Sequence, residues 1–184
     1  EEPRIPAAGG GKPAAPKLVE TVEFSYGDGR SHDGESVAAD PDGRFLYMIT
    51  RNRVGAECFA FRVARYEDAE KRKLKKKIVA EKIAVLNCRN ISAADISPDG
   101  LRMLLQTYGD AYEYSRKPGG TWKQALKGKP LEVTLPRRYK GEGATYSHDG
   151  KSIYLTTEGR NCPLYVLEPK PRPQAPGLRR QETR

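Results

Sequence analysis

The sequence is poor in the residues that carry most metal, redox and nucleophilic chemistry. Its 184 residues include two histidines, three cysteines, two methionines and one tryptophan. Cys58, Cys88 and Cys162 form no C-x-x-C pair, and no histidine stands at metal-ligand spacing from them, which excludes the common zinc and thioredoxin-type motifs. Three cysteines allow at most one internal disulfide, and the sequence does not choose the pair.

Long apolar runs are also absent. No stretch approaches the roughly 20 apolar residues that a membrane-spanning helix requires, and no apolar leader opens the chain. The composition, 37% hydrophobic and 31% charged, is sufficient to bury a core in a chain of this length. We therefore expect a folded chain without a membrane span.

The net charge of +9 is concentrated in two places, the run 71–77 and the tail 169–184. Surfaces that bind single-stranded nucleic acid interleave aromatic residues with basic ones. The run 71–77 has only Leu74 among its basic residues. Nucleic acid is therefore not favoured as a partner.

What the sequence does contain is a repeat. The segments 34–43, 91–100 and 141–150 align without a gap, and each ends in Asp/Ser-Pro/His-Asp-Gly. Asp-Gly provides a positive backbone φ at little steric cost, which predicts a tight turn between two strands. Short runs with strand character follow each turn, at 44–50, 57–63 and 78–86, then at 101–108, 111–115 and 131–135, and then at 151–157 and 163–167.

Four short antiparallel strands in a repeat of about 50 residues are typical of one blade of a β-propeller. We therefore predict an all-β fold, a partial β-propeller of about three four-stranded antiparallel blades. The predicted boundaries are a flexible Pro/Gly linker at 1–17, an outer strand of a preceding blade at 18–26, blades at 31–86, 88–135 and 140–168, and a basic Pro-rich tail at 169–184.

Three blades create a physical problem, because propellers typically close with four to eight. An open stack exposes an apolar blade face at each end. Further blades outside this chain, a second copy of the chain, or closure into a small ring by the strand at 18–26 would each cover these faces. The missing start methionine and that unaccompanied strand favour the first remedy, in which the chain is the C-terminal part of a longer propeller.

The segment Ile96-Ser97-Pro98-Asp99-Gly100 resembles the Ser-Pro-Asp-Gly turn of bacterial WD40-like propellers of the TolB type. The wider pattern, which includes Asp33-Gly34-Glu35-Ser36 and Gly141-Glu142-Gly143, is similar to a family of bacterial extracytoplasmic propellers, some of them labelled phytase- or esterase-like. The resemblance covers about residues 19–168. It implies a propeller fold and a periplasmic or secreted location.

Five carboxylates are the candidate binding residues: Asp33, Glu35, Asp95, Glu142 and Glu158. Glu35 and Glu142 occupy the same position in their repeats, at the mouth of the inner strand and close to the propeller axis. A carboxylate cluster facing the channel would bind a cationic group, or Ca²⁺ through oxygen ligands with Glu35 and Glu142 as the metal ligands. The alternative is that these groups accept hydrogen bonds and fix the blades.

Catalytic motifs are not evident. His148 stands where the other turns have Pro41 and Pro98, and no Gly-x-Ser-x-Gly elbow is present. Trp122 is predicted to anchor a blade connection. We therefore expect a non-catalytic propeller module, without a cofactor, that binds a protein, glycan or small ligand at the end of its channel. The alternative is a Ca²⁺-dependent phosphoesterase-like hydrolase that uses the channel carboxylates.

Overall fold

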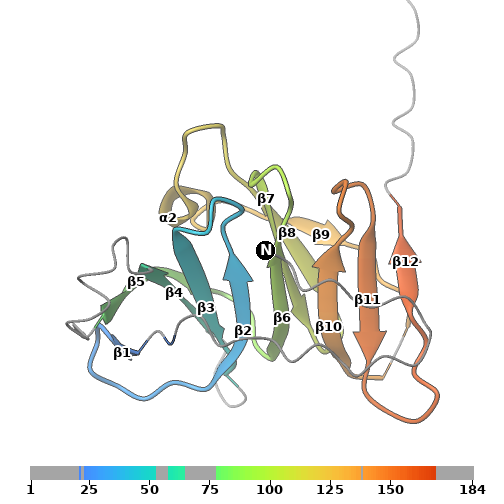
Figure 1. Ribbon diagram of the computed structural model, residues 1–184. Helices are drawn as coiled ribbons and strands as arrows, with labels where there is room; N and C mark the ends of the chain where they lie inside the picture. Colours follow the sequence, from blue (N-terminus) through green and yellow to red (C-terminus); the bar gives the residue numbers. More distant parts are fainter. Residues whose placement is uncertain (1–20, 22, 53–57, 65–77, 138, 169–184) are drawn as a thin grey trace, which may run out of the picture.

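The computed structural model describes residues 21, 23–52, 58–64, 78–137 and 139–168, in which twelve strands form three sheets (Figure 1). The predicted linker at 1–17, the tail at 169–184 and the basic run at 71–77 lie outside the described residues. No helix within the described ranges has the length and apolar character to cross a membrane.

The first sheet has the order β1-β5-β4-β3-β2. Its strands are β1 (Phe24–Tyr26), β2 (Gly34–Ala39), β3 (Phe45–Thr50), β4 (Cys58–Ala64) and β5 (Ile78–Leu86). The second sheet contains β6 (Ile91–Ile96), β7 (Arg102–Thr107), β8 (Ala111–Ser115) and β9 (Leu131–Val133), and the third contains β10 (Gly141–Tyr146), β11 (Ile153–Thr157) and β12 (Tyr165–Leu167).

The inner strands β2, β6 and β10 lie next to one another, and each sheet extends outward from its inner strand (Figure 1). This radial arrangement of antiparallel sheets is a partial β-propeller, so the predicted fold class is confirmed. Inner strands have little room near the axis, and small side chains such as Ala38, Ala94 and Ala144 meet this requirement.

The second blade is buried on both faces, which explains the nearly continuous apolar run of β7. Met103 and Leu105 face the first blade, where they join Ile49 and other residues in the main core cluster. Leu104, between them, faces the third blade and packs in a separate cluster with Tyr146. Successive side chains of a strand point to opposite faces, so a strand between two blades must be apolar at consecutive positions.

The three Asp-Gly turns share one geometry. Gly43, Gly100 and Gly150 have φ of 69°, 71° and 67°, and each donates its N–H to the carbonyl three residues earlier at 2.7–2.8 Å. The aspartate before each glycine accepts hydrogen bonds inside the turn. Asp99, for example, accepts from the Ser97 hydroxyl at 2.5 Å and from the Leu101 N–H at 2.9 Å. The repeat in the sequence is thus a repeat of a hydrogen-bonded turn.

These turn donors favour the ionised carboxylate. The Ser97 hydroxyl and the Leu101 N–H lower the pKa of Asp99 below its usual value. The pKa of Asp149 is lowered in the same way by Ser147 and the Lys151 N–H. A group whose pKa is lower in the folded state stabilises the fold above its unfolded-state pKa of about 4. That contribution is lost as the pH falls through the folded-state pKa.

Asp99→Asn tests this pH dependence. The amide oxygen still accepts the turn hydrogen bonds but cannot titrate, so the stability difference between the wild-type chain and the variant should shrink as the pH falls from about 6 to about 2. Urea midpoints measured across this range report the difference. Glu132→Gln, at an exposed position of β9, is the control. A wild-type advantage over Asp99→Asn that stays constant across the range would contradict the prediction.

The position of β1 corrects the sequence-based interpretation. The segment 18–26 was expected to belong to a preceding blade, whereas β1 pairs in parallel with β5, with Phe24 opposite Ile78, as the outermost strand of the first sheet. The Tyr26 ring lies 4.6 Å from the Phe61 ring, and the His32 ring lies 5.0 Å from it. The physical reason is burial, because the end face of the first blade is apolar and the segment that precedes β2 supplies part of its cover.

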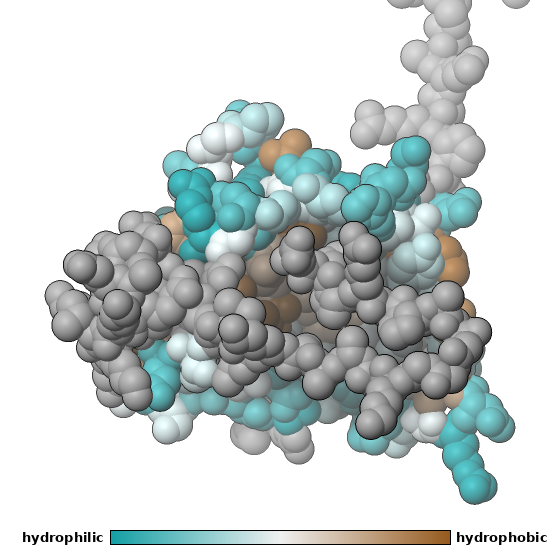
Figure 2. Space-filling model, in the orientation of Figure 1, coloured by the Kyte–Doolittle hydropathy of each residue, from teal (hydrophilic) through white to brown (hydrophobic). Residues whose placement is uncertain are grey.

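The opposite end face, on the third blade, is more open. Tyr154 and Val166 face each other across β11 and β12 and are 36% and 52% exposed, and Leu164 is 63% exposed. Apolar residues also reach the molecular surface beside β12 in the space-filling view (Figure 2). Within the described part of the chain, the apolar end face of the first blade is therefore partly covered, whereas that of the third blade stays exposed.

Candidate functional site

The predicted channel carboxylates do not form one cluster. Asp33 and Glu35 both form ion pairs with Arg51, whose Nη2 lies 3.1 Å from Asp33 Oδ2 and contacts Glu35 Oε1. The Arg51 side chain is only 9% exposed, so the guanidinium lies between the two carboxylates and largely out of solvent. One guanidinium thus offsets part of the negative charge that was expected to face a ligand.

The polar contacts of Arg51 continue across the ends of the blades. Its Nη1 donates to the Tyr108 hydroxyl of the second blade at 3.0 Å. Lys140, before β10, lies 5.6 Å from the centre of the Tyr108 ring and forms an ion pair with Glu158 at 3.2 Å. Glu158 therefore contributes to a network that links the blades. Glu142 is partly buried, and its side chain makes no hydrogen bond or ion pair with the described residues.

Asp95 lies toward the other end of its strand. It is the fifth residue of β6, whereas Glu35 is the second residue of β2, and this offset corresponds to about 10 Å along a strand. Its Oδ2 accepts hydrogen bonds at 2.7 Å from the Tyr146 N–H and from the Thr145 hydroxyl. The structure thus separates Asp95 from the other candidates and places it as a link between the second and third blades.

Calcium would need six to eight oxygen ligands. In the portions of the chain that the structure describes, no group of three or more His, Cys, Asp or Glu side chains is arranged to hold a metal ion. Arg51 also places a positive charge beside Glu35, one of the two proposed ligands. The residues present at this end are a poor fit for Ca²⁺, and a calcium site formed by Glu35 and Glu142 stays a prediction.

A cleft of about 630 Å³ lies at the opposite end, on the side of the Asp-Gly turns. It runs between the first and second blades, from the turns at 40–43 and 97–100 to the connection between β8 and β9. No pattern in the sequence predicted this cleft, because its walls come from segments more than 50 residues apart in the chain.

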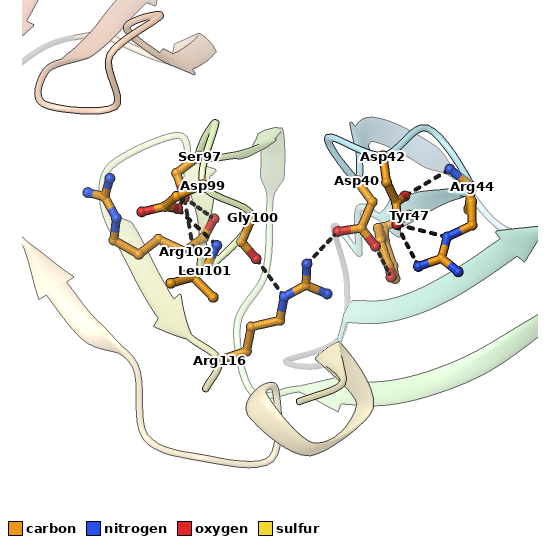
Figure 3. Close-up of polar contacts among 10 residues, drawn as sticks. All are labelled: Asp40, Asp42, Arg44, Tyr47, Ser97, Asp99, Gly100, Leu101, Arg102 and Arg116. Carbon is orange, nitrogen blue, oxygen red and sulfur yellow. Dashed lines mark hydrogen bonds and ion pairs between the residues drawn. The ribbon is translucent and has the colours of Figure 1, made fainter. Parts of the chain in front are cut away.

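Arg116 forms the base of this cleft and joins the two blades. Its Nε donates to the Gly100 carbonyl at 2.5 Å, and its Nη2 donates to Asp40 Oδ1 at 2.8 Å (Figure 3). The other Asp40 oxygen accepts the Tyr47 hydroxyl at 2.8 Å. Burial, together with this hydrogen bond, raises the pKa of Tyr47, so the hydroxyl stays protonated. The polar groups of the base thus bond to one another.

The connection between β8 and β9 forms one wall. It contains the short helix α2 (Trp122–Ala125), which begins with a capping box in which Thr121 and Gln124 bond each other's backbone N–H groups. Trp122 is 1% exposed and packs in the main core, and the Arg116 guanidinium lies 4.7 Å from its ring centre. The structure places Trp122 as the anchor of this connection. The Thr-x-x-Gln pattern was the signal that could have predicted the helix.

The rim of the cleft carries paired charges. Arg62 and Lys123 both bind Glu81, at 2.6 Å and 2.8 Å, and they lower its pKa so that it stays ionised. Arg44 pairs with Asp42 at 2.8 Å. Among the described residues, four cationic and four acidic side chains line the cleft, the base included, and apolar surface comes from Phe45, Ile83, Leu101 and Pro118. The described part of the lining is therefore amphipathic, with equal numbers of positive and negative side chains.

Close packing at the turns gives a further prediction. Gly100 and Gly119 have similar φ, 71° and 74°, but a Cβ on Gly100 would lie 3.0 Å from Arg116 Nη2, whereas a Cβ on Gly119 would meet nothing within 4 Å. Gly119→Ala should cost about 1 kcal/mol for the left-handed backbone alone. Gly100→Ala should cost about 2–3 kcal/mol, because it also displaces Arg116. Urea unfolding of both variants tests this, and equal losses would show that the contact with Arg116 is unimportant.

No protein-family model matches the chain, and no curated protein sequence does. Among solved structures, the chain is similar to hydrazine synthase of Kuenenia stuttgartiensis, with 15% identity, a TM-score of 0.49, and coverage of 73% of this chain and 34% of that one. It is also similar to TolB from Acinetobacter baumannii, with 18% identity, a TM-score of 0.45, and coverage of 72% of this chain and 29% of that one. The matched region thus spans about a third of each of these longer chains.

Proposed function

We propose that this chain is a non-catalytic β-propeller binding module whose ligand occupies the cleft between the first and second blades. The observation that carries the proposal is the cleft itself. Its volume of about 630 Å³ lies within the usual range for ligand sites. Its base is held in place by hydrogen bonds from Arg116 to both neighbouring turns.

The proposed ligand is an extended peptide segment of a partner protein. A peptide presents both N–H and C=O groups, and the paired cations and carboxylates of the rim can bond to both. Arg62, Glu81 and Lys123 remain 39–54% exposed and retain free hydrogen-bonding capacity. A glycan is less favoured because Tyr47 and Trp122 are 3% and 1% exposed and offer no open ring face, while Arg62 covers Phe45 at 4.8 Å.

The calcium-dependent hydrolase is the second candidate from the sequence, and the geometry favours it less. It requires carboxylates that converge on one point, whereas Asp33, Glu35 and Glu158 are each paired with a cation.

A periplasmic or secreted location belongs to the proposal as well. It is supported by the turn motif at 96–100, and cell fractionation of the native source, with a cytoplasmic marker as control, tests it.

Selection of peptides from a random library tests the binding function. Selected peptides are titrated by calorimetry against the wild-type chain and against the double variant Arg62→Ala/Lys123→Ala, which removes the rim cations. We expect at least about a tenfold loss of affinity, corresponding to about 1.4 kcal/mol. Lys151→Ala is the matched control, because Lys151 is an exposed turn lysine of the third blade, 79% exposed and outside the cleft lining.

Two outcomes would overturn the proposal. Selected peptides that bind the double variant as tightly as the wild-type chain would place the site elsewhere, and the absence of any enriched peptide would exclude extended peptides as the ligand.

A parallel calcium titration addresses the second candidate, the hydrolase. Calcium-dependent heat and a raised Tm that both disappear in Glu35→Gln and Glu142→Gln would favour the hydrolase.

A further inference from the structure

Two of the three cysteine side chains meet where the first blade connects to the second. Cys58 is the first residue of β4 and is paired with Leu86 of β5. Cys88 follows Leu86 by two residues, and its N–H donates to the Leu86 carbonyl at 2.8 Å. This turn places Cys88 against the main core cluster, which contains Cys58, and the two thiols interact with each other.

The backbone holds this arrangement in place. Asn90 has a left-handed conformation with φ of 57°, and its N–H donates to the Asn52 carbonyl at 3.3 Å. The segment that carries Cys88 is therefore tied to the start of the connection that follows β3. The sulfur of Cys58 in turn accepts hydrogen bonds from the N–H groups of Asn52 and Ile91. The proximity of the thiols is thus built into the blade connection.

The three cysteines differ in access. Cys58 is 0% exposed, whereas Cys88 is partly exposed and lines a surface hollow of about 360 Å³ together with Arg89 and Asp110. Cys162 is exposed on the third blade, where its thiol contacts the Gly159 carbonyl. A reagent of small size therefore reaches Cys88 directly, but reaches Cys58 only through Cys88.

The hydrogen bonds also divide the two thiols chemically. The hydrogen bond from Cys88, with help from the N–H groups of Asn52 and Ile91, lowers the pKa of Cys58, and burial opposes this effect. The same thiol–thiol hydrogen bond, followed by burial, raises the pKa of Cys88. The order of attack in a thiol–disulfide exchange therefore follows from access, because only Cys88 is reached directly from the hollow.

We propose that Cys58 and Cys88 are a disulfide-forming pair that is oxidised by a small disulfide entering the hollow at Cys88. The Cys88 sulfur, as it loses its proton, attacks one sulfur of the small disulfide, and the other sulfur leaves as a thiolate that takes up a proton. Cys58 then attacks the Cys88 sulfur of this mixed disulfide and releases the second thiol. Two protein thiols lose two electrons and two protons in total, and the small disulfide gains them as two thiols.

The bond has a structural consequence. It closes a loop of about 30 residues that includes most of β4 and all of β5, and it ties the outer half of the first blade to the segment that enters the second. Loops of this length restrict the unfolded chain enough to raise the Tm by about 10 °C in a domain of this size.

Incubation with oxidised glutathione tests the proposal in the full chain carrying Cys162→Ser. We expect an intact mass lower by two hydrogens, a cross-linked peptide pair containing Cys58 and Cys88, no lasting glutathione adduct, and the rise in Tm. Cys58→Ala in the same background should retain glutathione on Cys88, because the resolving thiol is missing. Cys88→Ala should leave the buried Cys58 unmodified.

Three results would overturn the proposal: a Cys162→Ser chain that stays a dithiol, one that retains glutathione on Cys88, or a wild-type chain whose cross-link contains Cys162. The Cys162→Ser chain keeps the pair intact, so its result stands even if the variants in the core fail to fold. The expected cross-link is also independent of the peptide cleft, so the two proposals can fail separately.

Discussion

Replacing Arg116 with methionine is expected to lower the free energy of unfolding by about 3 kcal/mol. The substitution keeps much of the side-chain volume but removes the guanidinium that bonds to Asp40 and to the Gly100 carbonyl. Asp40 is 6% exposed and Arg116 is 19% exposed, so water can replace the lost contacts only in part. The cost comes chiefly from a buried carboxylate that loses its cation.

Arg44→Met is the matched control for this experiment. Arg44 also pairs with a turn aspartate, Asp42, but the two side chains are 70% and 46% exposed. Exposed ion pairs contribute little, so the urea midpoint of this variant should be unchanged. Urea unfolding followed by circular dichroism measures both variants. If Arg116→Met were no less stable than Arg44→Met, Arg116 would not be the tie between the first two blades.

The second large effect is expected at Trp122. Trp122→Ala should lower the free energy of unfolding by about 3–5 kcal/mol, because it opens a cavity in the core between the first two blades. The substitution also removes the indole ring, whose centre lies 4.7 Å from the guanidinium carbon of Arg116. The base of the cleft thereby loses its support. Peptide affinity should therefore fall together with stability.

Trp122→Phe separates the volume of the ring from its polar atom. The indole Nε1 is buried and has no hydrogen-bond partner among the described residues. Phenylalanine therefore loses volume but also removes an unsatisfied donor worth about 1–3 kcal/mol. We expect it to cost markedly less than Trp122→Ala. Val166→Ala, at a 52% exposed position of β12, should change stability by less than about 0.5 kcal/mol. Equal losses for the alanine and phenylalanine variants at Trp122 would contradict this account.

The features that follow from local sequence were predictable. Each Asp-Gly turn is determined by a few consecutive residues, because glycine permits the positive φ and the aspartate accepts hydrogen bonds two residues away. The apolar runs after the turns correspond to β3, β7 and β11. Repetition of the turn then indicated the propeller, since one blade cannot bury both of its faces alone.

The features that depend on distant partners were not predictable in the same way. The strand pattern at 18–26 was visible, but this strand was assigned to a preceding blade because its partner β5 lies more than 50 residues away. The carboxylates were recognised by residue type and position, but their cations were not. Arg51 is separated from Asp33 by 18 residues, and Lys140 from Glu158 by the length of a hairpin.

By itself, the sequence determined that the chain forms successive antiparallel blades joined at sharp turns, because turn conformation and strand alternation depend on neighbouring residues. Tertiary structure decided which charges are compensated, where a cleft opens and which two cysteines meet. Each of these depends on atoms brought together from different blades, as Arg116 reaches Asp40 across 76 residues. Distances of that kind are set by the packing of whole sheets, and no short pattern in the chain encodes them.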